Sequence, residues 1–167
     1  MKTHHKFILL LVIPVFSYAQ DTTVVKKQAE TVAVAEMKGH YEVVTEHTYP
    51  KLLLAVGGKD KMTATIKQAM EMLKNQGFSI TSITIGTPGK FYKAGSEIHC
   101  LVPQMIVMTS SNGRLVNNGN LLAVSKDGGK FWYFLDINRG TYSVIPKLFP
   151  NFNKNLIIPE PRQPGFD

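Results

Sequence analysis

The chain has 167 residues, of which 44% are hydrophobic and 10% aromatic, and its formal net charge at pH 7 is +7. This composition excludes an intrinsically disordered chain, and the length suits a single domain that can bury a core without disulfides or metal. The basic residues are spread along the sequence, with no nucleic-acid-binding motif and no zinc-ligand spacing. We therefore expect neither a nucleic-acid partner nor a bound metal.

The first 19 residues have the features of a secretory signal peptide. Lys2 and Lys6 precede an apolar run over residues 7–16, and Ala19 ends a small-residue cleavage site. The apolar run is shorter than the roughly 20 residues that a membrane span needs. The sequence therefore predicts export, to the periplasm or outside the cell, with residues 20–167 as the mature domain.

Helical spacing dominates the first half of this domain. Apolar residues three and four apart predict a helix over residues 25–37, and shorter helical patterns cover residues 40–49 and 51–56. The clearest helix spans residues 60–76, where Met and other apolar side chains form one stripe. Gly77 is typical of a helix end.

After that glycine the pattern changes to the period of strands. Residues 78–86 alternate, with a slip near Thr81 that indicates a β-bulge. Longer strands are predicted over residues 94–109, 114–125 and 130–138, joined by tight turns. Helices followed by antiparallel strands indicate an α+β fold.

The strand around Cys100 is apolar on both faces, so both faces need cover. Helices can cover one face. The other is left for a partner, a ligand, a second copy in a homodimer, or the Pro-rich arm that we expect at about residues 150–167. Cys100 itself has the surroundings of a buried, inert thiol.

The segment SKDGGKFW places Ser125, Asp127, Gly129 and Trp132 at S-x-D-x-G-x-x-W spacing. This resembles the Asp-box hairpin of sialidase-type propellers, although one copy in a chain of this length cannot build a propeller. Asp side chains bond their own backbone in turns, and glycine permits a positive φ. We therefore predict a structural turn, with a carbohydrate-contacting module through residues 125–132 as a weaker alternative.

Residues 39–62, GHYEVVTEHTYPKLLLAVGGKDKM, resemble the opening of SnoaL-like proteins in the nuclear-transport-factor-like superfamily. With the long strands that follow, the resemblance covers about residues 24–140. It implies N-terminal helices packed on a curved antiparallel sheet, which forms a cone with an interior pocket. The sequence lacks the family's usual helix between strands, which leaves a cystatin-like roll open. Family members act as isomerases, dehydratases or cyclases, bind ligands, or form dimers.

An acid–base pair in such a pocket would need a carboxylate that converges with a His or Tyr. Glu97, His99 and Asp136 are the catalytic candidates on this ground, although the pattern favours a protein that is not an enzyme. The candidates for lining a ligand pocket are aromatic or imidazole side chains: Tyr41, His47, Tyr49, His99, Trp132 and Phe134.

The sequence thus favours an exported, non-enzymatic domain without a cofactor. We expect it to bind a small apolar or amphipathic ligand, or a protein partner. The alternative is a small pocket lyase or isomerase of the SnoaL-like type.

Overall fold

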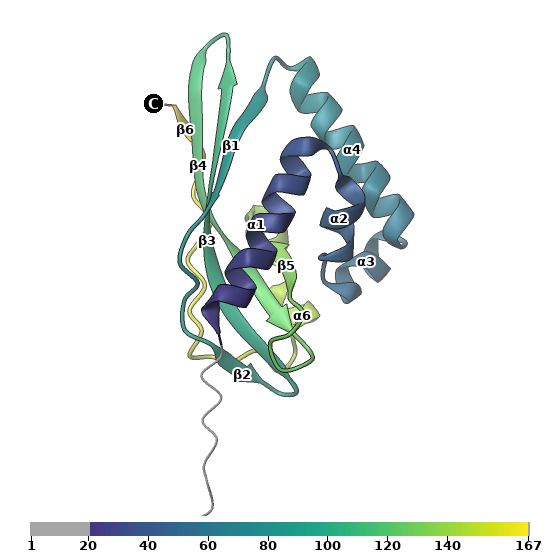
Figure 1. Ribbon diagram of the computed structural model, residues 1–167, viewed down its shortest axis with the longest axis vertical. Helices are drawn as coiled ribbons and strands as arrows, with labels where there is room; N and C mark the ends of the chain where they lie inside the picture. Colours follow the sequence, from purple (N-terminus) through teal and green to yellow (C-terminus); the bar gives the residue numbers. More distant parts are fainter. Residues whose placement is uncertain (1–20, 167) are drawn as a thin grey trace, which may run out of the picture.

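The structure is a computed structural model that describes residues 21–166 (Figure 1). The predicted signal peptide lies outside the described residues. Within them, no helix has the length and apolar character needed to cross a membrane. Helices come first along the chain and an antiparallel sheet follows, which confirms the predicted α+β fold.

The three predicted N-terminal helices are present. They are α1 (Thr22–Lys38), α2 (Tyr41–Glu46) and α3 (Pro50–Val56). Gly39 and Gly57 end α1 and α3 with φ of 74° and 95°, a left-handed conformation that residues with a β-carbon rarely adopt. These two breaks turn a continuous helical sequence into separate pieces that fold around the sheet.

The fourth helix, α4 (Lys59–Asn75), has the predicted apolar stripe but no fully buried residue. It packs mainly against α2 and α3. Figure 1 shows α4 on the side of α2 that is away from the sheet, with its upper end turned toward β1. The stripe is therefore only half covered by protein, which has consequences for the site described below.

The sheet has the strand order β1-β3-β4-β5, with β2 paired to the lower part of β3. All these pairs are antiparallel, and the predicted bulge in β1 falls between Ile80 and Ser82. The strands are β1 (Ser79–Ile85), β2 (Tyr92–Ala94), β3 (Glu97–Ser110), β4 (Gly113–Ser125) and β5 (Tyr133–Asp136).

Two strand predictions need correction. Of the strand predicted over residues 130–138, only β5 forms. Side chains accept hydrogen bonds from the backbone N–H groups that would otherwise have extended this strand. Phe131 N–H donates to the Asp127 carboxylate (3.0 Å), and Trp132 N–H donates to the Gln28 side chain (2.9 Å). The sequence also missed β2, whose three residues are returned onto β3 by a turn at Gly95 with φ of 65°.

The two faces of the sheet carry separate cores. On the helix face, α1 residues Val25 and Ala29 pack with Cys100, Val102 and neighbouring apolar residues. On the opposite face, Leu122 and Leu135 pack with residues that follow β5. Alternate residues of β3 and β4 supply the two cores, as the period of a strand requires.

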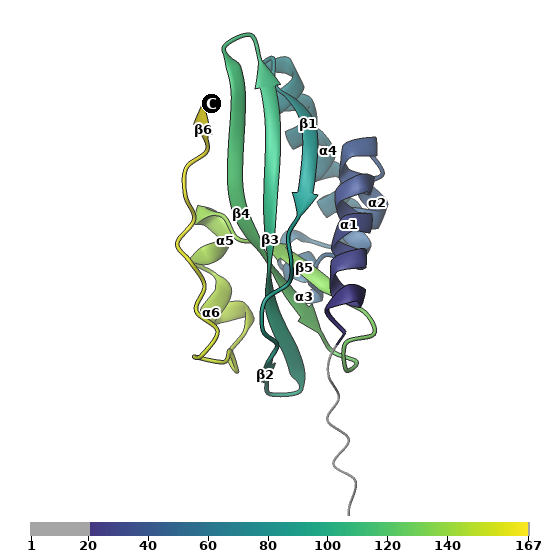
Figure 2. The ribbon, with the colours of Figure 1, turned by 60° about the vertical axis from the view of Figure 1, so that its left-hand side comes forward.

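The chain's own C-terminal segment covers that opposite face (Figure 2). It contains α5 (Arg139–Tyr142) and α6 (Ile145–Leu148), and continues as an extended arm whose β6 (Gly165–Phe166) pairs with β4. Of the covers left open by the sequence, the structure uses the chain's own C-terminal residues, which begin before the predicted arm with Ile137, Ile145 and Phe149. Cys100 is fully buried, and burial raises the pKa of its thiol to about 12, so the thiol is not ionised at neutral pH.

Candidate functional site

A cavity of about 370 Å³ lies between α1, α2 and α4 on one side and the sheet on the other. We call it the central cavity. Most of its wall is apolar, including Val32, Val44, Ile66, Ile85 and Phe134. Its size and apolar lining are those of a small-molecule site.

The cavity exists because α4 stands off the sheet and α1 offers small side chains. Ala29 and Ala33 line the cavity from α1, where larger residues would fill it. Met62 and Ile66 line it from the stripe of α4. The apolar surface that these helices do not bury against one another therefore faces the cavity.

Two carboxylates lie on the wall of this apolar space. Glu36 comes from the last turns of α1 and Asp136 from the end of β5. Asp136 is solvent-exposed as a residue, although many protein atoms lie around its carboxyl group, and Glu36 is half-buried. Burial raises the pKa of both groups, and for Glu36 the charge of Asp136 adds to the rise.

Neither carboxylate has a cationic partner among the described residues. The contacts between acidic and basic side chains there are Lys26–Glu30 and Glu97–His99. Asp136 accepts one side-chain hydrogen bond, from the Asn138 amide (2.8 Å), which offsets part of the effect of burial on its pKa. The two acids thus face one cavity with little compensation for their charge.

Other polar groups of the cavity wall are held by the fold. His47 Nδ1 donates to the Trp132 carbonyl (2.8 Å), because a carbonyl oxygen can only accept, and the His47 ring stacks on Phe131. Gln104 also lines the cavity, and its Oε1 is buried without a hydrogen-bond partner. An unpaired buried oxygen costs free energy. Gln104, like Glu36, is therefore an acceptor among the lining residues that receives no hydrogen bond from the described part of the chain.

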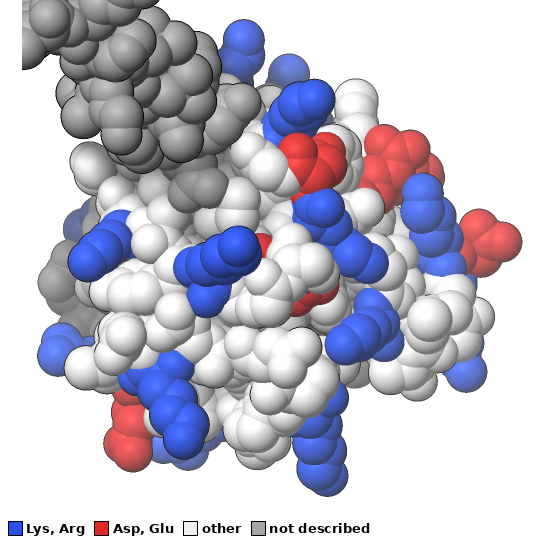
Figure 3. Space-filling model, turned by 90° about the horizontal axis from the view of Figure 1, so that it is seen from below, with Lys and Arg blue, Asp and Glu red and all other residues white. Residues whose placement is uncertain are grey.

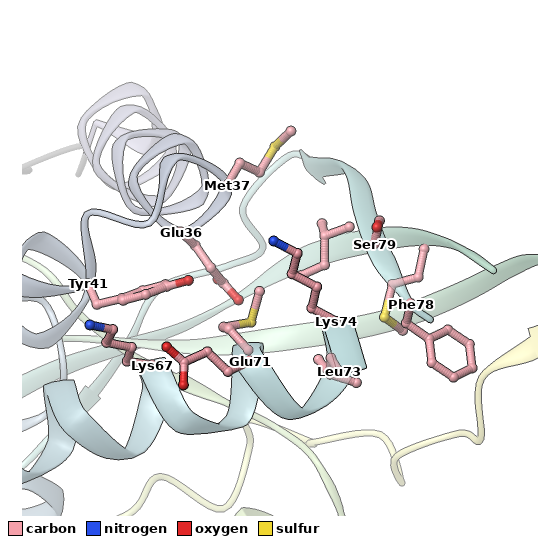
Figure 4. A pocket seen from close by; sticks show the side chains of 12 residues that line it. Glu36, Met37, Tyr41, Lys67, Glu71, Leu73, Lys74, Phe78 and Ser79 are labelled. Atoms are coloured by element: carbon pink, nitrogen blue, oxygen red, sulfur yellow. The ribbon is translucent and has the colours of Figure 1, made fainter. Parts of the chain in front are cut away.

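Two further cavities adjoin the central one. Glu36 separates it from a groove of about 300 Å³ that α4 lines with Lys67, Glu71 and Lys74. Figure 4 shows Glu36 reaching from α1 toward α4 in this groove, between Tyr41 and Lys74. We call it the upper groove.

On the other side, Asp136 and Asn138 also line a cavity of about 490 Å³ under the C-terminal arm. Its wall mixes polar and apolar residues and includes Arg139 and Arg162. The central cavity is therefore an apolar space that adjoins one further cavity at each acidic residue.

A separate polar cluster lies among residues of the opposite core. Glu97, at the start of β3, accepts from the Tyr49 hydroxyl (2.9 Å) and contacts His99 Nε2 (3.1 Å). Tyr49 and His99 are almost completely buried, and burial raises the pKa of Tyr49, with a further rise from Glu97. The carboxylate thus joins two buried side chains that come from different parts of the chain.

His99 is closed in by aromatic rings. Phe149 and Phe152 lie against it, with ring centroids at 5.1 and 5.5 Å. Its Nδ1 is buried without a partner. A neutral ring that donates from Nε2 to Glu97 avoids placing a second proton at that unpaired nitrogen.

Burial lowers the pKa of His99, and Glu97 opposes this only in part. The unfolded chain, with an ordinary His pKa of about 6.5, therefore binds a proton more readily than the folded chain. We expect His99 to stabilise the fold above about pH 6.5 and this contribution to be lost as the pH falls through the lowered pKa. Unfolding free energies measured between pH 8 and 5 should decline less steeply in His99→Gln than in the wild type. A slope in His99→Gln as steep as in the wild type would contradict this contribution.

The structure divides the residues that the sequence selected as catalytic. Glu97 and His99 meet, but Asp136 lies on the central cavity. The three candidates therefore do not form one site.

The ligand-pocket candidates divide in the same way. His47 and Phe134 line the central cavity, and Tyr41 lines the upper groove. Tyr49 and Trp132 line none of these three cavities. His99 borders only a space of about 140 Å³ at the opposite core.

The hairpin at residues 125–132 is held by its own hydrogen bonds. Asp127 Oδ1 accepts from the Ser125 hydroxyl and from the backbone N–H of Lys130 and Phe131. Trp132 is 1% exposed, and its indole N–H donates to the Gly129 carbonyl (2.9 Å). The indole therefore has no free face or donor for a sugar.

Sequence reasoning missed Glu36 and Gln104. A signal for Glu36 was present, because it continues the three-four spacing of Ala29, Val32 and Ala33 on the buried side of α1. An acid at an apolar position of a helix is unusual unless it is paired or functional. Gln104 carried no comparable signal, since polar residues are common in long strands with an exposed stretch.

The lower end of the domain carries charged side chains of both signs (Figure 3). Figure 3 shows Lys and Arg scattered over the lower end, with Asp and Glu among them. Comparison with known proteins adds no assignment. No family model matches the chain, and no curated protein matches it significantly.

Proposed function

We propose that this domain binds a small amphipathic ligand in the central cavity and does not transform it. The observation that carries the proposal is the apolar cavity of about 370 Å³ whose wall includes the half-covered stripe of α4. A ligand with an apolar body would bury surface that the fold leaves accessible, which is the main source of affinity in such sites.

An amphipathic ligand is proposed because polar side chains interrupt the apolar wall of the cavity. Glu36 and Asp136 place carboxylate oxygens on an otherwise apolar wall, which Gln104 also lines. A purely apolar molecule would leave these groups without water and without a partner, which is unfavourable. A molecule with one polar end satisfies both kinds of wall.

The resemblance to SnoaL-like proteins supports a pocket at this position, because those proteins use the space between helices and sheet. The leader-like residues 1–19 support export as part of the same proposal. Against catalysis, Asp136 is separated from Glu97 and His99. The central cavity therefore contains two acids, but His99, the histidine predicted as a catalytic candidate together with Asp136, lies elsewhere.

Titration of the full chain with octan-1-ol tests the proposal, with the methionine methyl groups followed by NMR. Met62 lines the central cavity, while Met72 is 54% exposed and lines none of the three cavities. We expect a saturable shift of the Met62 signal and no comparable shift of Met72. Equal shifts at both, or none at Met62, would overturn the proposal.

A pair of substitutions on α4 provides the matched control. Ile66→Trp places a larger side chain on the cavity wall and should weaken octan-1-ol binding. Ala64→Trp, at an exposed position of the same helix, should leave binding unchanged. Thermal unfolding of both variants checks that the fold is retained.

A further inference from the structure

The chemistry of the central cavity goes further than its shape. Its acidic residues, Glu36 and Asp136, face the same apolar space, and neither forms an ion pair with a described residue, although basic side chains line the adjoining upper groove and the cavity under the arm. Glu36 is half-buried and Asp136 is exposed, but two like charges that face one apolar cavity are unfavourable, and a cation between them offsets this. Asp136 receives one side-chain hydrogen bond, from Asn138, and Glu36 receives none that the described residues provide.

A second observation points in the same direction. Gln104, from β3, lines the same cavity, and its Oε1 is buried with no donor. Glu36 from α1 and Gln104 from β3 are thus oxygen acceptors without a partner in the described part of the chain, and Asp136 from β5 accepts a single side-chain hydrogen bond. They call for a group that carries several N–H donors and a positive charge.

From this arrangement we infer that the ligand of the central cavity is an aliphatic amine, with its ammonium group between Glu36 and Asp136 and its apolar body against α1, α4 and the sheet. This inference rests on the proposed function, because it assumes that the cavity is occupied. An ammonium group has three donors and no acceptor, which suits two carboxylates.

Other occupants fit less well. A carboxylate or phosphate head would add a third negative charge beside the acids. Arg139 and Arg162 could attract an anion, but they line the cavity under the arm rather than the central one. Lys67 and Lys74 line the upper groove and form no ion pair with Glu36. The two acids therefore remain available to an external cation.

Three ligands with the same octyl chain test the inference: octylamine, octan-1-ol and octanoate. Each is titrated into the full chain at pH 7 with the Met62 methyl signal as readout. We expect octylamine to bind at least about tenfold more tightly than octan-1-ol, the effect of a hydrogen bond to a charged group. Octanoate should bind most weakly.

Charge-removing variants locate the effect. Glu36→Gln and Asp136→Asn should each lower octylamine affinity about tenfold and leave octan-1-ol affinity unchanged. Glu30→Gln, on the exposed side of α1, is the matched control and should change neither. Glu36→Gln is decisive if Asp136→Asn disturbs the Asn138 contact, because Glu36 makes no hydrogen bond that folding would need.

A pH series adds a readout that a merely structural role would not change. Octylamine stays protonated below about pH 10, so its affinity should fall as the pH is lowered and the acids take up protons. The affinity of octan-1-ol should be independent of pH over the same range.

The outcomes separate the two proposals. If octan-1-ol binds at Met62 and octylamine binds no more tightly, the amine assignment is wrong and the proposed function stands. If octylamine binds more tightly but Glu36→Gln and Asp136→Asn do not reduce this preference, the assignment is also wrong. If neither ligand shifts Met62, both proposals fail.

Discussion

Replacing Trp132 with alanine is expected to lower the free energy of unfolding by about 3–5 kcal/mol, the usual cost of truncating a large aromatic side chain in a core. Trp132 is 1% exposed and packs on Phe91, with ring centroids at 5.5 Å. It also ties the hairpin to the helix-face core through its bond to the Gly129 carbonyl. The substitution therefore creates a cavity and leaves that carbonyl without its donor.

Chemical denaturation followed by circular dichroism measures this effect, since the variant loses the chain's single tryptophan and with it the indole fluorescence. Phe131→Ala provides the neighbouring control. Phe131 is 36% exposed and stacks on His47, so its loss should cost about 1 kcal/mol or less. Similar losses for the two variants would show that Trp132 does not hold the core as described.

Replacing Glu97 with alanine is expected to cost about 2–4 kcal/mol, although a carboxylate is removed and no large apolar group is lost. The cost arises because the Tyr49 hydroxyl and His99 N–H would remain buried without an acceptor, and each unpaired group costs about 1–3 kcal/mol. Some relief comes from water, because the Glu97 side chain is 17% exposed.

Equilibrium unfolding at pH 7 measures the loss, with Glu42→Ala as the control at an exposed position of α2. The control should change stability by no more than about 0.5 kcal/mol. Glu97→Gln separates the two contacts, because its amide oxygen still accepts from Tyr49 while His99 must exchange the nitrogen that carries its proton. A loss in Glu97→Ala no larger than in Glu42→Ala would contradict the proposed role of the cluster in stability.

Several features of this protein follow from local sequence alone. The helices were predictable because their apolar residues recur with the helical period, and Gly39, Gly57 and Gly77 interrupt that period. The long strands β3 and β4 were predictable because their alternation is sustained and a glycine turn joins them. The turn at residues 125–132 was predictable because Asp127 bonds backbone groups only a few residues away.

Other features depend on contacts between distant parts of the chain. The strand predicted over residues 130–138 is shortened partly by Gln28, which takes the Trp132 N–H from the other end of the sequence. The hydrogen bond from Tyr49 to Glu97 requires the residue before α3 to lie against β3, which no local pattern specifies. Local propensity could not predict either contact, because each group can form other hydrogen bonds until the tertiary fold brings the two partners together.

The candidate site shows the same division. The sequence placed Asp136 in an apolar strand and Glu36 in the three-four spacing of a helix, although the role of Glu36 was not predicted. Only the tertiary structure brought the two acids to one cavity, because α1 crosses the face of the sheet on which β5 places Asp136. The sequence thus determined the elements and their apolar faces. The packing of α1, α4 and the C-terminal segment decided which surface is buried and which encloses a cavity, since that depends on how well distant faces fit together.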